Sequence, residues 1–141
     1  MRIRKATLKD KKFVKELDKE NMQPLIETTG QKYSGHMFDR FNSKDCLIIE
    51  DKDKLVGFLY FEIIGKKLHI FSIQIKRKFQ QKGYGNKLMG HIITFAKEKK
   101  LKKIILEAHD SNKQAINFYK NLKFKIKWIK KNKIGFEYNI K

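Results

Sequence analysis

The sequence has little of several features that mark whole classes of protein. Cys46 is its only cysteine, so no internal disulfide can form, and its strand-like surroundings predict that it is buried. No apolar run approaches the roughly 20 residues of a membrane span. Met1 to Lys5 lack the apolar core of a signal peptide. Proline occurs once, and no Pro-, Gly- or Ser-rich linker divides the chain. These absences favour a cytoplasmic protein with a single domain spanning residues 1–141.

Acidic residues are scarce relative to basic ones, and the net charge is +19. Such a charge is typical of nucleic-acid binding, and it also suits a polyanionic small ligand. Arginine, the residue best suited to bidentate recognition of phosphates and bases, occurs only at positions 2, 4, 40 and 77. The lysines are spread over nearly every segment, which favours a compositional bias over a dedicated nucleic-acid surface.

Apolar spacing and turn residues predict the order of secondary structure along the chain. Thr7 and Asp10 nearly match a capping box before the first helix, and Ser111-x-x-Gln114 has the capping-box form before the last. The order β-α-α-β-β-β-α-β-α-β-β predicts an α/β (α+β) fold, a mixed, mostly antiparallel sheet of about seven strands with helices on both faces. The predicted strands are 2–6, 46–50, 55–64, 68–76, 103–108, 124–129 and 134–140, and the predicted helices are 8–20, 21–29, 84–99 and one that opens at 111, with a further short helix at 33–41.

Two glycines, Gly83 and Gly85, stand where a predicted strand gives way to a predicted helix. Glycine tolerates positive φ and lets a ligand approach the backbone closely. The first amides of a helix have no partner inside it and lie at the positive end of the helix dipole. Together these features predict a cradle for a phosphate or pyrophosphate.

Two common phosphate-binding motifs do not fit these residues. The P-loop requires Gly-Lys followed by Ser or Thr, and Gly85-Asn86-Lys87-Leu88 lacks that hydroxyl. The dinucleotide fingerprint requires a third glycine, where this chain has Leu88. The pattern that fits is Gln/Arg-x-x-Gly-x-Gly/Ala, which runs here from Gln80 to Gly85. It resembles the acetyl-CoA pyrophosphate loop of the GNAT N-acetyltransferases. The alternative is an ordinary glycine-rich turn between a strand and a helix.

A second stretch resembles another motif of the same family, in the expected order along the chain. It reads Leu106-x-Ala108-x-x-x-Asn112-x-x-Ala115-x-x-Phe118-Tyr119. The resemblance covers about residues 45–140, and a weaker match to some bacterial members comprises Met22, Pro24, Gly30 and Tyr33.

Three residues depart from the family pattern. Arg77 stands where the family often has Pro, Gln81 replaces a frequent Gly, and Lys123 replaces the Gly before Phe124. If the backbone at Lys123 requires positive φ, lysine there costs roughly 1 kcal/mol.

The resemblance implies that acetyl-CoA is the cofactor and that its acetyl group passes directly to a primary amine. In this family the central strand splays from its neighbour, so backbone groups of Ile73 and Ile75 would pair with the pantetheine arm. An amide near Ile73 or Gln74 would polarise the thioester carbonyl, and Asn112 would fix the arm. The other residues expected at the cofactor are Gln80, Gln81, Lys82, Gly83, Tyr84, Gly85, Asn86, Lys87 and Phe118.

By its position in the family motif, Tyr119 would also contact the cofactor and protonate the leaving sulfur as a general acid. A core tyrosine on an amphipathic helix is the alternative. Glu62, on the strand before the central one, is the first candidate for the general base. Gln74 could orient a water that takes the proton, and His69 and His109 are further candidates. No His, Cys and Asp cluster has metal-ligand spacing.

The acceptor is expected to bind between the N-terminal helices, the β-hairpin tip and the final strand pair, with Glu27, Tyr33, His36 and Phe61 as candidate lining residues. It could be a peptide N-terminus, a lysine, a polyamine or an aminoglycoside. A second function from another class is a basic module that retains this fold and binds nucleic acid or ribosomes. Such a module would bind in a strongly salt-dependent way. Homodimers are common in the family and are possible here.

Overall fold

Seven strands form one mixed sheet in the order β1-β2-β3-β4-β5-β7-β6. The computed structural model describes residues 1–141. Neighbouring strands are antiparallel except β4 and β5, which are parallel. The predicted sheet of about seven strands, mixed and mostly antiparallel, is therefore confirmed. The strands are β1 (Arg2–Lys5), β2 (Cys46–Asp51), β3 (Lys54–Ile64), β4 (Lys67–Ile75), β5 (Lys103–His109), β6 (Lys125–Lys130) and β7 (Lys133–Asn139), and the α-helices are α1 (Lys11–Glu27), α2 (Tyr84–Glu98) and α3 (Lys113–Asn121).

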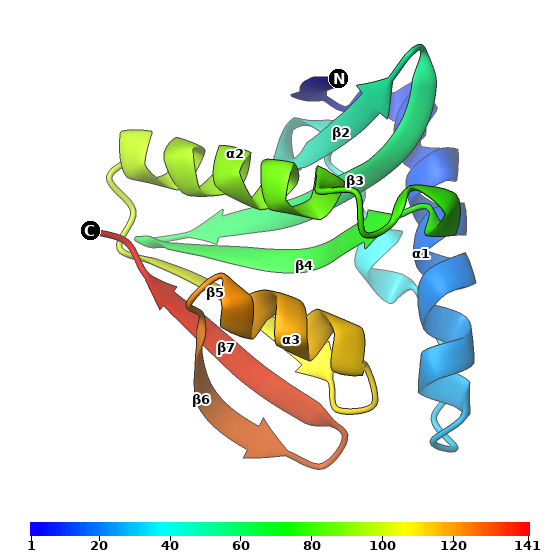
Figure 1. Cartoon of the computed structure of the whole chain (residues 1–141), viewed down its shortest axis with the longest axis vertical. Coiled ribbons are helices and arrows are strands. Elements are labelled where there is room, and N and C mark those ends of the chain that lie inside the picture. Colours follow the sequence, from blue (N-terminus) through cyan, green and yellow to red (C-terminus); the bar gives the residue numbers. More distant parts are fainter.

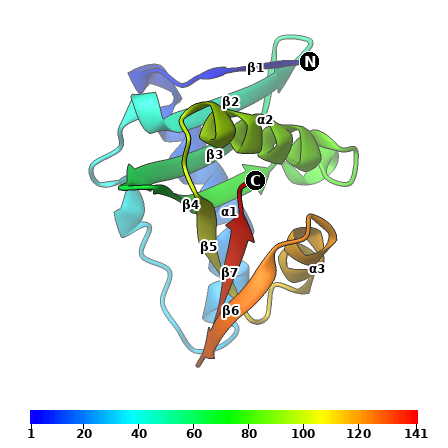
Figure 2. The same cartoon turned by 90° about the vertical axis from the view of Figure 1, so that its left-hand side faces the viewer.

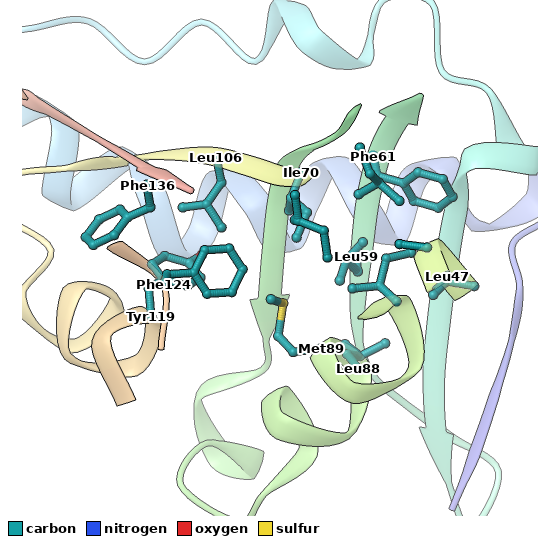
Figure 3. Close-up of a cluster of buried hydrophobic side chains, with 14 of the residues drawn as sticks. Leu47, Leu59, Phe61, Ile70, Leu88, Met89, Leu106, Tyr119, Phe124 and Phe136 are labelled. Carbon is teal, nitrogen blue, oxygen red and sulfur yellow. The ribbon is translucent and has the colours of Figure 1, made fainter. Parts of the chain in front are cut away.

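Helices cover both faces of the sheet because successive strand residues point to opposite sides. α1 lies on one face and α2 on the other (Figures 1 and 2). The larger core joins the sheet to α2 and α3, through Leu88 and Met89 of α2 and Tyr119 of α3 (Figure 3). The smaller core lies under α1 and contains Val14 and Phe58. None of these helices combines the length and the apolar character needed to cross a membrane.

The N-terminal third differs from the prediction in two places. The sequence suggested two helical pieces meeting near residue 21, but α1 is continuous from Lys11 to Glu27 and includes Pro24. Asn21 donates hydrogen bonds to Gln74 Oε1 (3.0 Å) and Ile75 O (3.1 Å) of β4, which hold the helix against the sheet at the expected break. The short helix predicted over residues 33–41 is reduced to one 3₁₀ turn, His36–Phe38.

The strands β4 and β5 pair only over Lys67–Ile70 and Lys103–Leu106 and then diverge (Figure 1). The cause lies in the register between β3 and β4. Tyr60 is opposite Ser72 and Phe61 is opposite Ile70, which leaves Phe71 as an extra residue in β4. Such a bulge bends its strand and increases the local twist. We call the opening between residues 71–75 of β4 and 107–109 of β5 the wedge.

Lys123, which replaces the glycine of the family pattern, has a strained backbone conformation. Lys123 follows α3 with φ of 73°, in the left-handed region that favours glycine. The Lys123 amide bonds Lys120 O, and the Phe124 amide bonds Tyr119 O, as expected of a left-handed residue that ends a helix. The geometry therefore requires positive φ where this chain carries a side chain.

Lys123→Gly is accordingly expected to raise the free energy of unfolding by about 1 kcal/mol. For a chain of this length the melting temperature should rise by roughly 3–5 °C. Lys120→Gly, inside α3, is the matched control and should lower stability by about 1 kcal/mol. Thermal unfolding followed by circular dichroism measures both, and a loss of stability in Lys123→Gly would contradict the strain argument.

Candidate functional site

The wedge exposes one backbone edge of β4. The Lys76 amide donates to Val56 O at 2.8 Å, so alternate residues of this antiparallel ladder bond to β3. Ile73 and Ile75 are the residues between, and their backbone groups point away from β3 into the wedge. Asn21 and Gln80 side chains already donate to Ile75 O. The groups left free are therefore the amides of Ile73 and Ile75 and the carbonyl of Ile73.

The glycine loop lies at the end of β4 and leads into α2. Gln81 and Gly83 have φ of 61° and 87°, and Gly83 is the N-cap of the helix. The first backbone amide after the loop to bond inside the helix is that of Lys87, which donates to Gly83 O. The amides from Gln81 to Asn86 have no acceptor within the protein. Unpaired donors at the positive end of a helix form a site for an anion.

Two side chains anchor this loop to the sheet. Tyr84 donates its hydroxyl to Asp51 Oδ2 at 2.6 Å, and Gln80 donates to Ile75 O at 3.0 Å. The Tyr84 bond lowers the pKa of the Asp51 carboxyl, which keeps this acceptor ionised. The loop is thus fixed at both its ends, which gives the free amides a defined position before any ligand arrives.

A cavity of about 1320 Å³ connects the loop, the wedge and the end of α1. Most of the residues expected at the cofactor line it: Ile73, Gln74, Ile75, Gln80, Gln81, Gly83, Tyr84, Gly85, Asn86, Asn112, Phe118 and Tyr119. Lys82 and Lys87 are exposed and lie outside this lining. The structure therefore brings the two sequence motifs together around one space.

α3 supplies Asn112 and Tyr119 to the cavity. Asn112, not Ser111, is the N-cap, so the Ser111-x-x-Gln114 capping box is wrong. Asn112 Oδ1 accepts from the Ala115 amide at 3.2 Å, which leaves its amide nitrogen for a ligand. Tyr119 packs its ring against Phe124 and Phe136 (Figure 3) and also against Phe118. Burial raises the pKa of the Tyr119 hydroxyl, so the group retains its proton.

Polar side chains from α1 and β4 line the other side of the wedge. Asp18 accepts from Ser72 Oγ and from Tyr33 Oη, both at 2.6 Å. Gln74 donates to Ser72 Oγ at 3.2 Å and accepts from Asn21. Tyr33 was expected near the acceptor, and it lines the cavity. This network connects α1 and the segment after it with the bulged part of β4.

The candidate bases have different surroundings. The Ser111 amide donates to His109 Nδ1 (3.3 Å), so this nitrogen accepts and Nε2 carries the proton toward Gln31 Oε1 (3.1 Å). With both nitrogens engaged, His109 joins β5 to the segment after α1. His69 bonds Glu107 Oε1 at 3.0 Å across the parallel pair, and this bond lowers the pKa of the Glu107 carboxyl.

Besides His69, four other expected residues do not line the cavity. Glu62 lies on β3 opposite His69, and Phe61 is buried against Phe95 of α2. His36 is exposed and bonds Asp39 at 3.1 Å, and Glu27 is exposed at the end of α1. These four therefore do not share the cavity with the residues expected at the cofactor.

Sequence reasoning missed the carboxylates that do line the cavity, Asp18 and Glu107. Asp18 stands in the apolar pattern of α1 next to Leu17, and both are buried. A charged residue at a core position of a helix is the signal that could have found it. Glu107 faces the cavity because β4 and β5 diverge beside it. Strand alternation in the sequence does not predict this divergence.

The model of the acetyltransferase (GNAT) family matches residues 12–124. No curated protein matches the chain in sequence.

Solved structures with a similar fold include two N-acetyltransferases and the protein Ard1. The ribosomal-protein-S18-alanine N-acetyltransferase of Escherichia coli is 18% identical, with a TM-score of 0.83 over 99% of this chain and 93% of that one. The PaiA N-acetyltransferase of Thermoplasma acidophilum, solved in complex with coenzyme A, is 19% identical, with a TM-score of 0.80 over 98% of each chain. Ard1 of Thermoplasma volcanium is 19% identical, with a TM-score of 0.82 over 99% and 97%. At these identities the similarity shows the fold.

Proposed function

The chain belongs to the acetyltransferase (GNAT) family, and we propose which of its residues bind acetyl-CoA and transfer the acetyl group to a primary amine. Members of this family are acetyl-CoA-dependent N-acetyltransferases. The observation that carries the assignment is the run of free amides from Gln81 to Asn86 at the start of α2. Such donors fit a pyrophosphate, which needs several hydrogen bonds and positive potential at once.

The open edge of β4 is the proposed binding site of the pantetheine arm. Ile73 and Ile75 offer backbone groups to an extended, amide-containing chain in the same way as to a neighbouring strand. Asn112 lines the same cavity, and its amide nitrogen is free to donate. When bound, acetyl-CoA supplies the activated acetyl group, and the Ile73 amide is the proposed donor to its carbonyl oxygen.

Tyr119 is the proposed general acid, because it lines the cavity with a hydroxyl that retains its proton. Glu107 is the proposed proton acceptor for the amine. Its carboxylate is ionised beside His69 and lines the cavity at the point where β5 leaves β4. Glu62, the first candidate from the sequence, lies outside the cavity and has no part in this proposal.

Calorimetric titration with acetyl-CoA, at low and at moderate salt, tests the function. We expect one molecule to bind per chain with an affinity that survives moderate salt, because backbone amides supply much of the binding. Absent binding would contradict the proposal. Heat that vanishes with salt would favour the second function, a basic module for nucleic acid or ribosomes, because counterion release makes such binding salt-dependent.

A further inference from the structure

Asp18 is a buried carboxylate on the wall of the cavity. Only 2% of the residue is exposed, yet it lines the same space as the wedge. A carboxylate taken out of water is costly unless a cation or several hydrogen bonds compensate it. No lysine, arginine or histidine lies within ion-pair distance of Asp18, although the chain carries a net charge of +19.

The partners of Asp18 are two neutral hydroxyl groups. Ser72 Oγ donates to Oδ1 and Tyr33 Oη donates to Oδ2, so each carboxylate oxygen keeps capacity for a further donor. Burial raises the pKa of the Asp18 carboxyl, while both hydroxyl groups act to lower it. The hydroxyl groups orient the carboxylate but leave its charge uncompensated.

Asp18 lies close in the structure to the β4 backbone that faces the wedge, on the face of the sheet opposite to Tyr119. Its partner Ser72 is the residue of β4 directly before Ile73, whose free amide faces the wedge. Ser72 and Ile73 point to opposite faces of the sheet. Asp18 therefore lies on the α1 face of the wedge, whereas Tyr119 belongs to the core under α2 and α3.

We propose that the Asp18 carboxylate, oriented by Tyr33 and Ser72, binds the ammonium group of the acceptor, so that the acceptor enters as a cationic aliphatic amine. This inference rests on the proposed function, because the acceptor meets the acetyl group at the same wedge. The ammonium supplies the charge and the donors that Asp18 lacks, and Glu107 then receives the proton that must leave before attack.

The proposal restricts the acceptor. Asp18 and Glu107 both line the cavity, so an amine with a carboxylate next to it meets two negative groups. A neutral aromatic amine offers no charge to Asp18. Aliphatic amines whose neighbouring atoms are neutral or positive fit, as in a polyamine, a lysine side chain or a peptide N-terminus.

The test uses two coenzyme A thioethers of nearly equal shape. S-(2-aminoethyl)-coenzyme A places an ammonium beside the sulfur, and S-propyl-coenzyme A places a methyl group there. Calorimetry at moderate salt should show that the wild-type protein binds the aminoethyl compound at least tenfold more tightly, since hydrogen bonds to charged groups are strong. Equal affinities in the wild-type protein would overturn the proposal without any variant.

Variants then assign the preference to a residue. Asp18→Asn keeps the shape of the side chain, and it should bind both thioethers with affinities within threefold of each other. Glu107→Gln, which leaves Asp18 and both of its hydroxyl partners in place, should retain the tenfold preference. A preference that survives in Asp18→Asn but is lost in Glu107→Gln would move the ammonium site to Glu107 and overturn the proposal.

Failure of the inference and failure of the proposed function give different results. If coenzyme A itself does not bind, the proposed function fails. If both thioethers bind with equal affinity, acetyl-CoA binding stands and only the assignment of Asp18 fails. Thermal melting of each variant verifies that it is folded before its affinities are compared.

Discussion

Gly83→Val is expected to weaken acetyl-CoA binding at least 100-fold, which corresponds to about 2.7 kcal/mol. Gly83 has φ of +87°, and a Cβ built there meets nothing within 4 Å. The valine side chain would therefore enter the open space before the free amides from Gln81 to Asn86. A β-branched residue also resists positive φ, so the loop itself would shift. Titration calorimetry with acetyl-CoA measures the change.

Gly65 offers a matched control for the backbone strain. It has φ of +61°, and a Cβ there also meets nothing within 4 Å. It lies in the turn between β3 and β4 and does not line the cavity. Gly65→Val should lose similar stability and keep its affinity for acetyl-CoA. If both variants lose affinity equally, damaged folding explains the result. An unchanged affinity in Gly83→Val would mean that the loop does not bind the cofactor.

Tyr119→Phe is expected to lower kcat by a factor of 10² to 10⁴, the usual contribution of a general acid. The dissociation constant for acetyl-CoA should stay within about twofold, because the ring contacts with Phe118, Phe124 and Phe136 remain. Release of free coenzyme A measures the rate. The acceptors for this assay are 1,4-diaminobutane, spermidine and a short peptide with a free N-terminus.

The pH dependence of the rate follows from the direction of the pKa shift. Burial raises the pKa of the Tyr119 hydroxyl above its ordinary value, so the hydroxyl keeps its proton through the neutral and mildly alkaline range. Activity should therefore not fall on the alkaline side until the pH reaches that raised pKa. A fall near pH 8 that Tyr119→Phe abolishes would contradict the raised pKa of the Tyr119 hydroxyl.

Tyr60→Phe is the control for removing a buried hydroxyl. Tyr60 is buried on the α1 face, accepts a hydrogen bond from the Asn42 amide at 3.2 Å and does not line the cavity. Its loss should cost about 1 kcal/mol of stability and leave kcat unchanged. An equal fall of kcat in both variants would return Tyr119 to a structural role.

The core was predictable in its pattern but not in its details. Strand alternation and helical spacing place Leu88 and Met89 of α2 and Tyr119 of α3 on apolar faces, and all are buried. The break expected near residue 21 is absent because Asn21 bonds to β4, a contact between residues more than fifty positions apart. Local spacing carries no information about such a contact.

The sequence by itself determined the family, the order of most elements and the position of the glycine loop, because these depend on glycine, on short motifs and on periodicities of 2 and 3.6 residues. Only the tertiary structure decided which side chains meet. A single extra residue at Phe71 turns β4 away from β5 and opens the wedge. That divergence places Asp18 and Glu107 at one cavity and leaves Glu62 outside it. The reason is physical: a bulge changes the direction of a whole strand.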